Sequence, residues 1–276
     1  MPKIKIIFCD VDNTLITGQA EILPSVSSAV KDYVKSGGIF VLTSARSPMA
    51  LEKLSQELEC NSLLISLNGS LVLQAVEKSG QVTTLFEKTM QPNVLPAILR
   101  IIQQEQLALS VNVYAGKKWF VNSHDKWVRQ EEKITGAMAT VGNLPKKLGT
   151  SSDPVNKILC MGEPADIDRL AVQLDHIAGL KINYLRSKPT YLEIVDESVS
   201  KMKAIEEVTK INKISIAETM AIGDGENDLP MIIDAGIGIA VGNAFPSVKQ
   251  AASHTVASNE AGGVAEAIRK YSGLAD

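Results

Sequence analysis

Near its start the chain reads Ile6-Ile7-Phe8-Cys9-Asp10-Val11-Asp12-Asn13-Thr14-Leu15, an apolar run that ends at two carboxylates. The apolar residues predict a buried β-strand, with Asp10 and Asp12 at its carboxyl end. Residues two apart in an extended segment point the same way, so both carboxylates can face one pocket. Open parallel sheets bind ligands at this end of their strands. Taken alone, the stretch is equally compatible with a solvated turn, so the rest of the chain must distinguish the two.

The composition is that of a globular protein without a nucleic-acid or membrane surface. The 276 residues carry a formal net charge of -3, the pI is near 5.8 and aromatic residues make up only 4%. We therefore expect no nucleic-acid partner, and no apolar segment reaches the ~18 residues of a membrane span. The three cysteines are far apart and include no Cys-Xaa-Xaa-Cys pair. They predict reduced, buried thiols and a cytoplasmic location.

The order of the predicted elements indicates an α/β fold. Strands at 6–9, 39–42 and 63–67 alternate with helices that begin near Pro24 and Pro48. This alternation is typical of a parallel sheet with right-handed crossovers. The same rhythm returns near the end of the chain, where a helix is predicted at 199–209 and strands at 219–222 and 237–241. The prediction is a Rossmann-like parallel-sheet core of three layers, α/β/α.

Between these two pieces the rhythm changes to hairpins mixed with helices. A hairpin around Ser79-Gly80 leads into a helix at 92–106, strands within 111–121 and at 157–161, a helix at 165–177, and strands at 182–186 and 191–195. This pattern predicts an α+β module inserted at residues 84–195. The core would then consist of residues 1–83 and 196–276.

Polar clusters follow four of the predicted core strands, and the carboxyl ends of parallel strands share one edge of the sheet. The clusters are Asp10 with Asp12, Ser44, Asn68, and Asp224 with Asp228. Either aspartate pair alone could belong to a solvated turn. Several carboxylates that converge need a hard cation, and oxygen ligands suit Mg²⁺. Asn227 can cap the following helix and can also point toward an anion.

The chemistry that fits such a site is phosphoryl transfer to a carboxylate. The three histidines are scattered, and the chain has no Gly-Xaa-Ser-Xaa-Gly elbow and no Walker loop. A carboxylate nucleophile with a metal remains, and the metal would offset repulsion between Asp10 and a phosphate. A second carboxylate can move protons, and a hydroxyl and an ammonium can hold the phosphoryl oxygens. Ser44 and Lys201 are the candidates, although Lys201 taken alone is more often a solvated helix residue.

The ordered motifs resemble those of the haloacid dehalogenase-like (HAD) hydrolases, most closely the Cof-type class IIB members. The motifs of the two core pieces are Asp10-Val11-Asp12-Asn13-Thr14-Leu15, Leu42-Thr43-Ser44-Ala45-Arg46, Asn68-Gly69, Val199-Ser200-Lys201 and Gly223-Asp224-Gly225-Glu226-Asn227-Asp228. Further matches near the end of the chain are Pro230-Met231, Gly242-Asn243-Ala244 and Gly262-Gly263-Val264-Ala265. The inserted module resembles the class IIB α/β cap domain in position and character.

The resemblance implies roles for the four aspartates. Asp10 would be the nucleophile that becomes an aspartyl-phosphate. Asp12 would be the general acid and base, with its backbone carbonyl on Mg²⁺. Asp224 would complete the metal site with Asp10, and Asp228 would support it directly or through water.

The resemblance also implies a phosphate site, with two departures from the family pattern. Ser44 and Lys201 would bind the phosphoryl group, and Asn227 would contact phosphate or order its loop. Ala45 replaces the usual glycine of the second motif, which predicts a slightly different phosphate geometry. Asn13 replaces a glycine of the first motif, for which no loss of chemistry is expected.

The predicted function is that of a Mg²⁺-dependent phosphatase acting on phosphate monoesters of small metabolites, with sugar phosphates as the favoured class. One alternative is a phosphomutase of the same fold, which returns the phosphoryl group to its substrate. Another is a catalytically silent binding or regulatory protein, which would lack a catalytic carboxylate or the lysine. No such residue is missing from this chain. The predicted partner is a small phosphorylated metabolite, and the sequence makes no prediction of the oligomeric state.

Overall fold

The computed structural model describes residues 4–60, 63–75, 82–144, 154–177 and 179–274, which form two compact units. The core unit comprises Met1–Ala45, Leu51–Phe86 and Ser200–Asp276. The insert unit comprises Arg46–Ala50 and Glu87–Val199. The long insertion thus runs from residue 87 to residue 199, where the sequence had suggested 84 to 195. The turn predicted at Ser79-Gly80 lies outside the described residues.

The core unit contains an eight-stranded sheet in the order β14-β13-β12-β1-β2-β3-β4-β5. The pairings from β14 through β3 are parallel, and β4 runs antiparallel to β3. The strands are β1 (Ile6–Cys9), β2 (Ile39–Thr43), β3 (Leu63–Ser66), β4 (Leu71–Ala75), β5 (Val82–Glu87), β12 (Thr219–Gly223), β13 (Ile237–Ala240) and β14 (His254–Thr255). The predicted parallel α/β core is confirmed.

The register of the central strands aligns their carboxyl ends. Cys9 of β1 lies opposite Leu42 of β2 on one side and opposite Ile222 of β12 on the other. All residues of β1 and β12 are buried, as expected for strands covered on both faces. The polar residues that directly follow these three strands therefore emerge at one edge of the sheet.

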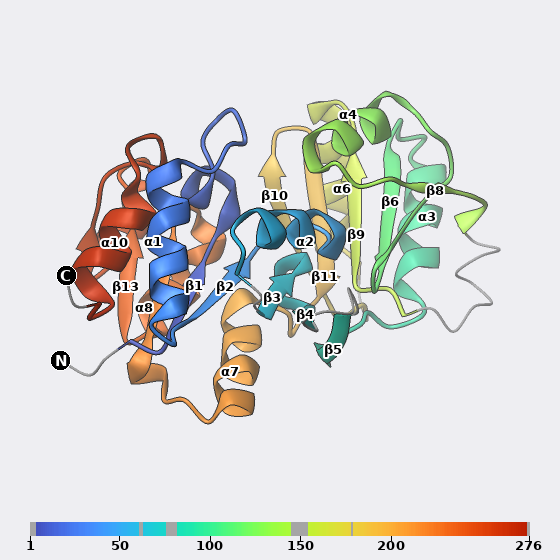
Figure 1. Ribbon diagram of the computed structural model, residues 1–276. Coiled ribbons are helices and arrows are strands. Elements are labelled where there is room, and N and C mark those ends of the chain that lie inside the picture. Colours follow the sequence, from blue (N-terminus) through green and yellow to red (C-terminus); the bar gives the residue numbers. More distant parts are fainter. Residues whose placement is uncertain (1–3, 61–62, 76–81, 145–153, 178, 275–276) are drawn as a thin grey trace. The chain divides into compact units, whose positions relative to one another are not determined.

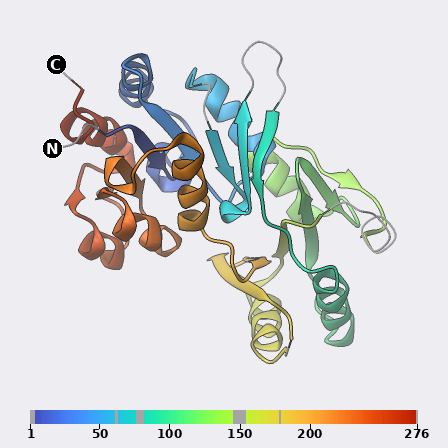
Figure 2. The same cartoon turned by 90° about the horizontal axis from the view of Figure 1, so that it is seen from below.

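Helices cover both faces of the core sheet. On one side α1 packs against β2 and α10, and in Figure 1 the two helices lie next to each other. Figure 2 shows α7 on the side of the strands opposite to α1. The helices are α1 (Pro24–Lys35), α2 (Pro48–Glu57), α7 (Lys201–Asn212), α8 (Leu229–Asp234), α9 (Pro246–Ala251) and α10 (Gly263–Tyr271). Short helical turns are η1 (Val11–Leu15), η2 (Leu67–Gly69), η3 (Ile216–Glu218), η4 (Glu226–Asp228) and η5 (Asn259–Ala261).

The insert unit has its own six-stranded sheet, in the order β10-β11-β9-β6-β7-β8. Its pairings are antiparallel except that of β7 with β8. The strands are β6 (Ser110–Ala115), β7 (Lys118–Val121), β8 (Thr140–Val141), β9 (Lys157–Met161), β10 (Ile182–Lys188) and β11 (Tyr191–Asp196). The helices α3 (Val94–Gln104) and α6 (Pro164–Asp175) share an apolar core with β6, β9 and β11, and Figure 2 shows them on the same side of this sheet.

The sequence missed α4 (Lys126–Thr135), a helix of the insert unit. The segment reads Lys-Trp-Val-Arg-Gln-Glu-Glu-Lys-Ile-Thr, in which only Trp127, Val128 and Ile134 are apolar and only Val128 is buried, so the apolar stripe that reveals an amphipathic helix is short. The remaining signal was the cap, because the Asp125 carboxylate accepts hydrogen bonds from the backbone N–H groups of Trp127 and Val128 at 2.9 and 3.0 Å. The two-residue strands β8 and β14 are too short for a periodic pattern.

Two expectations drawn from composition can be compared with the structure. Across the described residues, no helix has both the length and the apolar character needed to cross a bilayer. Cys9, Cys60 and Cys160 all lie in the described part of the chain, where each is buried and without a disulfide. The prediction of buried, unbridged thiols is therefore confirmed.

Candidate active site

Three carboxylates meet at the carboxyl edge of the core sheet. Asp10 directly follows β1, Asp224 directly follows β12, and Asp228 ends the turn η4. One oxygen from each lies within 4.8 Å of the others, and all three side chains are buried. The Asp10 backbone N–H donates to the Ile222 carbonyl at 2.9 Å, which continues the β1–β12 ladder to the nucleophile candidate. The aligned strands thus bring together carboxylates that are 214 residues apart in the sequence.

An ammonium group lies between two of these carboxylates. Lys201 is the first residue of α7, and the Ser200 hydroxyl caps the helix by accepting from the Lys203 N–H at 3.1 Å. Lys201 Nζ donates to Asp10 Oδ1 at 2.5 Å and to Asp228 Oδ1 at 2.6 Å. Its side chain is only 2% exposed. The helix cap therefore fixes the start of α7, and with it the point from which Lys201 enters the site.

Burial and charge perturb the pKa values of these groups. Burial raises the pKa of Asp10 well above its usual range; attraction to Lys201 opposes this shift, and repulsion from Asp228 and Asp224 adds to it. Burial likewise raises the pKa of Asp224 to about 6. Burial alone would lower the pKa of Lys201, but attraction to Asp10 and Asp228 outweighs it and raises the pKa. Lys201 therefore carries a positive charge, whereas burial and repulsion between neighbouring carboxylates disfavour the ionised forms of Asp10 and Asp224.

Three further hydrogen bonds hold the loop after β12. The second oxygen of Asp228 accepts the backbone N–H groups of Asp224 at 3.1 Å and Gly225 at 3.0 Å. The Thr14 hydroxyl donates to Asp224 Oδ1 at 2.8 Å. A Cβ on Gly223 would lie 2.6 Å from Asp228 Oδ2, so only glycine allows this close turn. Sequence reasoning gave Thr14 no role, and no local signal could have found it, because its partner Asp224 lies 210 residues away in the sequence.

The other predicted site residues differ in how deeply they are buried. Ser44 directly follows β2 and is buried, and its carbonyl accepts the Asn68 N–H at 3.2 Å. Asn227 lies within η4 and is half-buried. Asp12 lies within η1, and its side chain is exposed. The structure therefore places Asp10, Asp224 and Asp228 with oxygens within 4.8 Å of one another and Lys201 in contact with Asp10 and Asp228, whereas the Asp12 side chain is exposed.

The comparisons with known proteins give the family. The sequence model of the haloacid dehalogenase-like hydrolases matches residues 7–268, almost the whole chain. The chain is a haloacid dehalogenase-like hydrolase. Over 263 residues, this HAD hydrolase is 29% identical to a Haemophilus influenzae protein named "Putative phosphatase", with 95% of each chain covered. The resemblance deduced from the motifs is confirmed.

Solved structures agree with this assignment. The HAD hydrolase superposes on a haloacid dehalogenase-like hydrolase from Bacteroides thetaiotaomicron with a TM-score of 0.86 and 29% identity, covering 97% of this chain and 99% of that one. The fold is also that of BT4131, described as a HAD subclass IIB sugar phosphatase, with a TM-score of 0.79, 19% identity, and coverage of 97% and 98%. The family and the curated relative make the chain a phosphatase.

The donor set of this HAD hydrolase fits a divalent metal ion. Three buried carboxylates face a single ammonium, so the group carries excess negative charge when ionised. Buried charges need a compensating partner, and carboxylate oxygens are the ligands that hard cations prefer. Among the described residues, this is the one group of acidic, histidine or cysteine side chains arranged to hold an ion. Asp10, Asp224 and Asp228 are therefore the side chains that could hold a metal.

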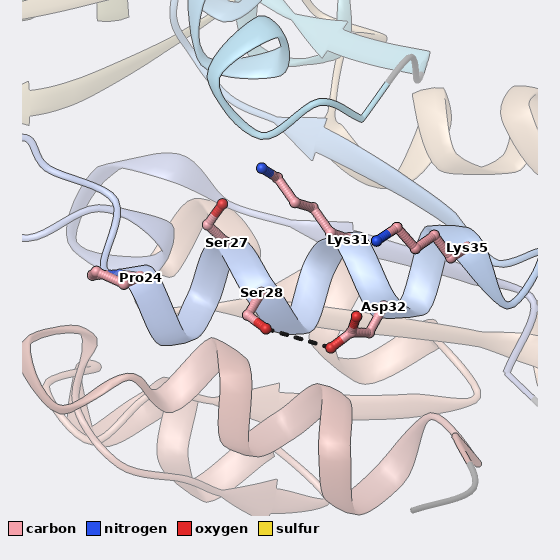
Figure 3. Close-up of a pocket in the computed structure, with 6 residues that line it drawn as sticks. All are labelled: Pro24, Ser27, Ser28, Lys31, Asp32 and Lys35. Atoms are coloured by element: carbon pink, nitrogen blue, oxygen red, sulfur yellow. Dashed lines mark hydrogen bonds between the residues drawn. The ribbon is translucent and has the colours of Figure 1, made fainter.

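A hollow elsewhere on the HAD hydrolase lacks these features. It is an open surface hollow of about 340 Å³ along α1, and Figure 3 shows its lining side chains extending from that one helix. The lining residues are Pro24, Ser27, Ser28, Lys31, Asp32 and Lys35. The Lys31 ammonium pairs with Glu59 at 2.8 Å, so this cation is already engaged. The hollow contains none of the predicted site residues, and the site therefore remains at the sheet edge.

Gly69 offers a test of how Lys201 is positioned. Its φ is +99°, and a Cβ there would lie 2.3 Å from the Ser200 carbonyl oxygen. We expect Gly69→Ala to lower the free energy of unfolding by about 1–3 kcal/mol and to reduce turnover, because the cap of α7 must shift. Thermal unfolding and aryl phosphate hydrolysis measure the two effects.

Gly37→Ala is the matched control for Gly69→Ala. Gly37 also has a positive φ, +88°, but a Cβ there would meet no atom within 4 Å. This variant should show the backbone strain alone and keep full turnover. Equal activity in the two variants would contradict a role of Gly69 in positioning Lys201.

Proposed function

We propose that this phosphatase hydrolyses phosphate monoesters of small metabolites in a Mg²⁺-dependent reaction through an aspartyl-phosphate on Asp10. The observation that carries the proposal is the convergence of Asp10, Asp224, Asp228 and Lys201 in one buried group. A carboxylate nucleophile next to an ammonium and further metal-binding carboxylates suits attack on a dianionic phosphate.

In the first half-reaction an Asp10 oxygen attacks phosphorus and the bond to the ester oxygen breaks. Asp12, as the protonated acid, gives its proton to that leaving oxygen. The exposure of Asp12 suits this role, because Asp10 attacks from the side of phosphorus opposite the leaving oxygen, and an exposed side chain is accessible to that oxygen. The Ser44 hydroxyl, the Lys201 ammonium and the Asn227 amide hold the phosphoryl oxygens on which charge collects.

In the second half-reaction Asp12, now a carboxylate, takes a proton from water. The water oxygen attacks phosphorus, the bond to Asp10 breaks, and inorganic phosphate leaves. The starting protonation states of Asp10 and Asp12 are thereby restored, so each turnover consumes one water molecule and one ester.

The metal ion would be held by the Asp10 and Asp224 carboxylates and the backbone carbonyl of Asp12. When bound, Mg²⁺ would neutralise charge between the carboxylates and the phosphate. Asp228 would support the metal site without being its main ligand, because its two oxygens already accept hydrogen bonds from Lys201 and from the N–H groups of Asp224 and Gly225.

For the substrate we propose a sugar phosphate or a similar small phosphorylated metabolite. The subsidiary support is the sugar phosphatase of subclass IIB that shares the fold. We also propose that the insert unit is the cap domain of this class and that it selects the leaving group. The phosphomutase alternative predicts that phosphate appears only as a by-product and that a sugar bisphosphate activates the protein. Steady phosphate release without a bisphosphate would exclude it.

Metal removal tests the proposal. We expect EDTA to lower the rate of p-nitrophenyl phosphate hydrolysis by about 10²-fold or more, because several kcal/mol of charge stabilisation would be lost. Excess Mg²⁺ added after removal of the chelator should restore the rate, and Ca²⁺, with its longer bonds and looser geometry, should restore less. Hydrolysis that continues undiminished in EDTA would rule out the metal-dependent mechanism.

A further inference from the structure

The turn that carries Asp12 needs support from outside its own sequence. In η1, Asp12 has φ -72° and ψ 127°, and Asn13 enters the left-handed region with φ 58° and ψ 7°. These angles interrupt the helical turn. One hydrogen bond closes the turn from within the segment, donated by the Ile16 N–H to the Val11 carbonyl at 3.1 Å. The direction of the Asp12 side chain therefore depends on what fixes the backbone on either side of it.

Two asparagines from the far end of the chain supply this support. Asn243, in the loop after β13, donates from Nδ2 to the Asn13 carbonyl at 2.7 Å. Its Oδ1 accepts the backbone N–H of Asn259 at 2.9 Å. Asn259 in turn donates from Nδ2 to the Ile16 carbonyl at 2.9 Å, and its side chain is buried. Two carbonyls that follow Asp12, that of Asn13 within the turn and that of Ile16 directly after it, are thus held by one connected pair of amides.

The loop that carries Asn243 is itself held by the loops that follow β14 and β12. The Gly242 N–H donates to the Ala257 carbonyl at 3.0 Å, and a Cβ on Gly242 would lie 2.8 Å from the Ser258 nitrogen. In the same loop the Phe245 N–H donates to the Asp224 carbonyl at 3.0 Å. The loop of residues 242–245 therefore contacts the Asp12 turn through Asn243 and the Asp224 turn through Phe245.

We infer that Asn243 and Asn259 are positioning residues that hold Asp12 at the angle needed for proton transfer to the leaving group. The inference rests on the proposed function, in which Asp12 is the general acid. Asn243 uses a donor and an acceptor at once, so aspartate cannot replace it: a carboxylate oxygen would face the Asn13 carbonyl. Neither asparagine belongs to the buried carboxylate group, and both act through the backbone of the turn.

The test compares two substrates that differ in their need for the acid. An alkyl phosphate expels a strongly basic alkoxide and requires a proton, whereas p-nitrophenyl phosphate expels a stable phenolate. We expect Asn243→Asp to lower kcat/KM for the alkyl phosphate by about 10²-fold, the usual size of a general-acid contribution, and to change the aryl value by only about threefold. Asn259→Asp, which loses the donor to the Ile16 carbonyl, should act in the same direction.

Two further variants make the result decisive. Glu260→Gln is the matched control, because Glu260 follows Asn259 but binds the Gly18 N–H, beyond the Asp12 turn, and should leave the ratio of alkyl to aryl kcat/KM unchanged. Asp12→Asn reports the ratio when the acid itself is lost. If Asp12→Asn leaves the ratio unchanged, the proposed role of Asp12 fails. If Asp12→Asn shifts it while Asn243→Asp and Asn259→Asp lower both substrates equally, the asparagines are merely structural and the inference is overturned.

Thermal unfolding separates these outcomes from simple loss of fold. Rates are compared at a temperature at which each variant is folded by circular dichroism. If Asn243→Asp does not fold at any such temperature, Asn259→Asp decides the question by the same ratio. An unchanged ratio in a folded Asn259→Asp variant would then count against the inference.

Discussion

Asp10→Asn should abolish phosphate ester hydrolysis while leaving the protein folded. The asparagine carboxamide is nearly isosteric and can still accept the Lys201 hydrogen bond through Oδ1, but it is not a competent nucleophile toward phosphorus. We expect kcat for p-nitrophenyl phosphate to fall by about 10⁴-fold or more, as for loss of other covalent nucleophiles. Phosphate release at saturating Mg²⁺, followed over hours, measures the residual rate.

Asp32→Asn is the matched control for Asp10→Asn. It makes the same chemical change on the exposed face of α1, where the Asp32 carboxylate contacts only the Ser28 hydroxyl at 3.4 Å among the residues drawn in Figure 3. It should retain full activity. Near-normal turnover in Asp10→Asn would show that another group attacks the phosphate and would contradict the aspartyl-phosphate mechanism.

The strand-end rule explains why much of this site could be predicted. Asp10 and Asp224 each directly follow a fully buried strand, and the parallel register of β1 with β12 then forces them together. The same rule gave Ser44 its place at the end of β2. These positions depend on the sheet alone, and an apolar run with a sharp end defines them in the sequence.

Lys201 and the two asparagines depend on tertiary contacts instead. Lys201 reaches Asp10 across 191 residues because α7 begins beside Gly69, a close approach that no local pattern encodes. Its selection from the sequence rested on its place at the start of the helix that follows the inserted module, and the family motif then supported it. Asn243 meets the Asn13 carbonyl across 230 residues, and a single asparagine in a loop carries no periodic signal. The apolar pattern along the chain therefore predicts which residues lie at the carboxyl edge of the sheet. Tertiary packing decides which other residues contact them there.

Removing the Lys201 ammonium should impair both stability and catalysis. The side chain is buried between Asp10 and Asp228, so Lys201→Met leaves two buried carboxylates without their partner. Breaking a buried ion pair from one side lowers the free energy of unfolding by about 3–5 kcal/mol. Loss of a positive group at the transferring phosphoryl should also lower kcat by about 10³-fold. Chemical denaturation and phosphate release measure the two effects.

Two further variants distinguish the effect of the Lys201 charge from the effect of its packing. Lys203→Met changes the same residue type two positions along α7, where the side chain is 62% exposed and pairs with Glu206, and should alter stability by less than about 0.5 kcal/mol. Adding Asp228→Asn to Lys201→Met should recover part of the lost stability, because one uncompensated carboxylate is then neutral. A strictly additive double variant would mean that the ammonium acts by filling space. A Lys201→Met protein as stable and active as Lys203→Met would refute the electrostatic account of the site.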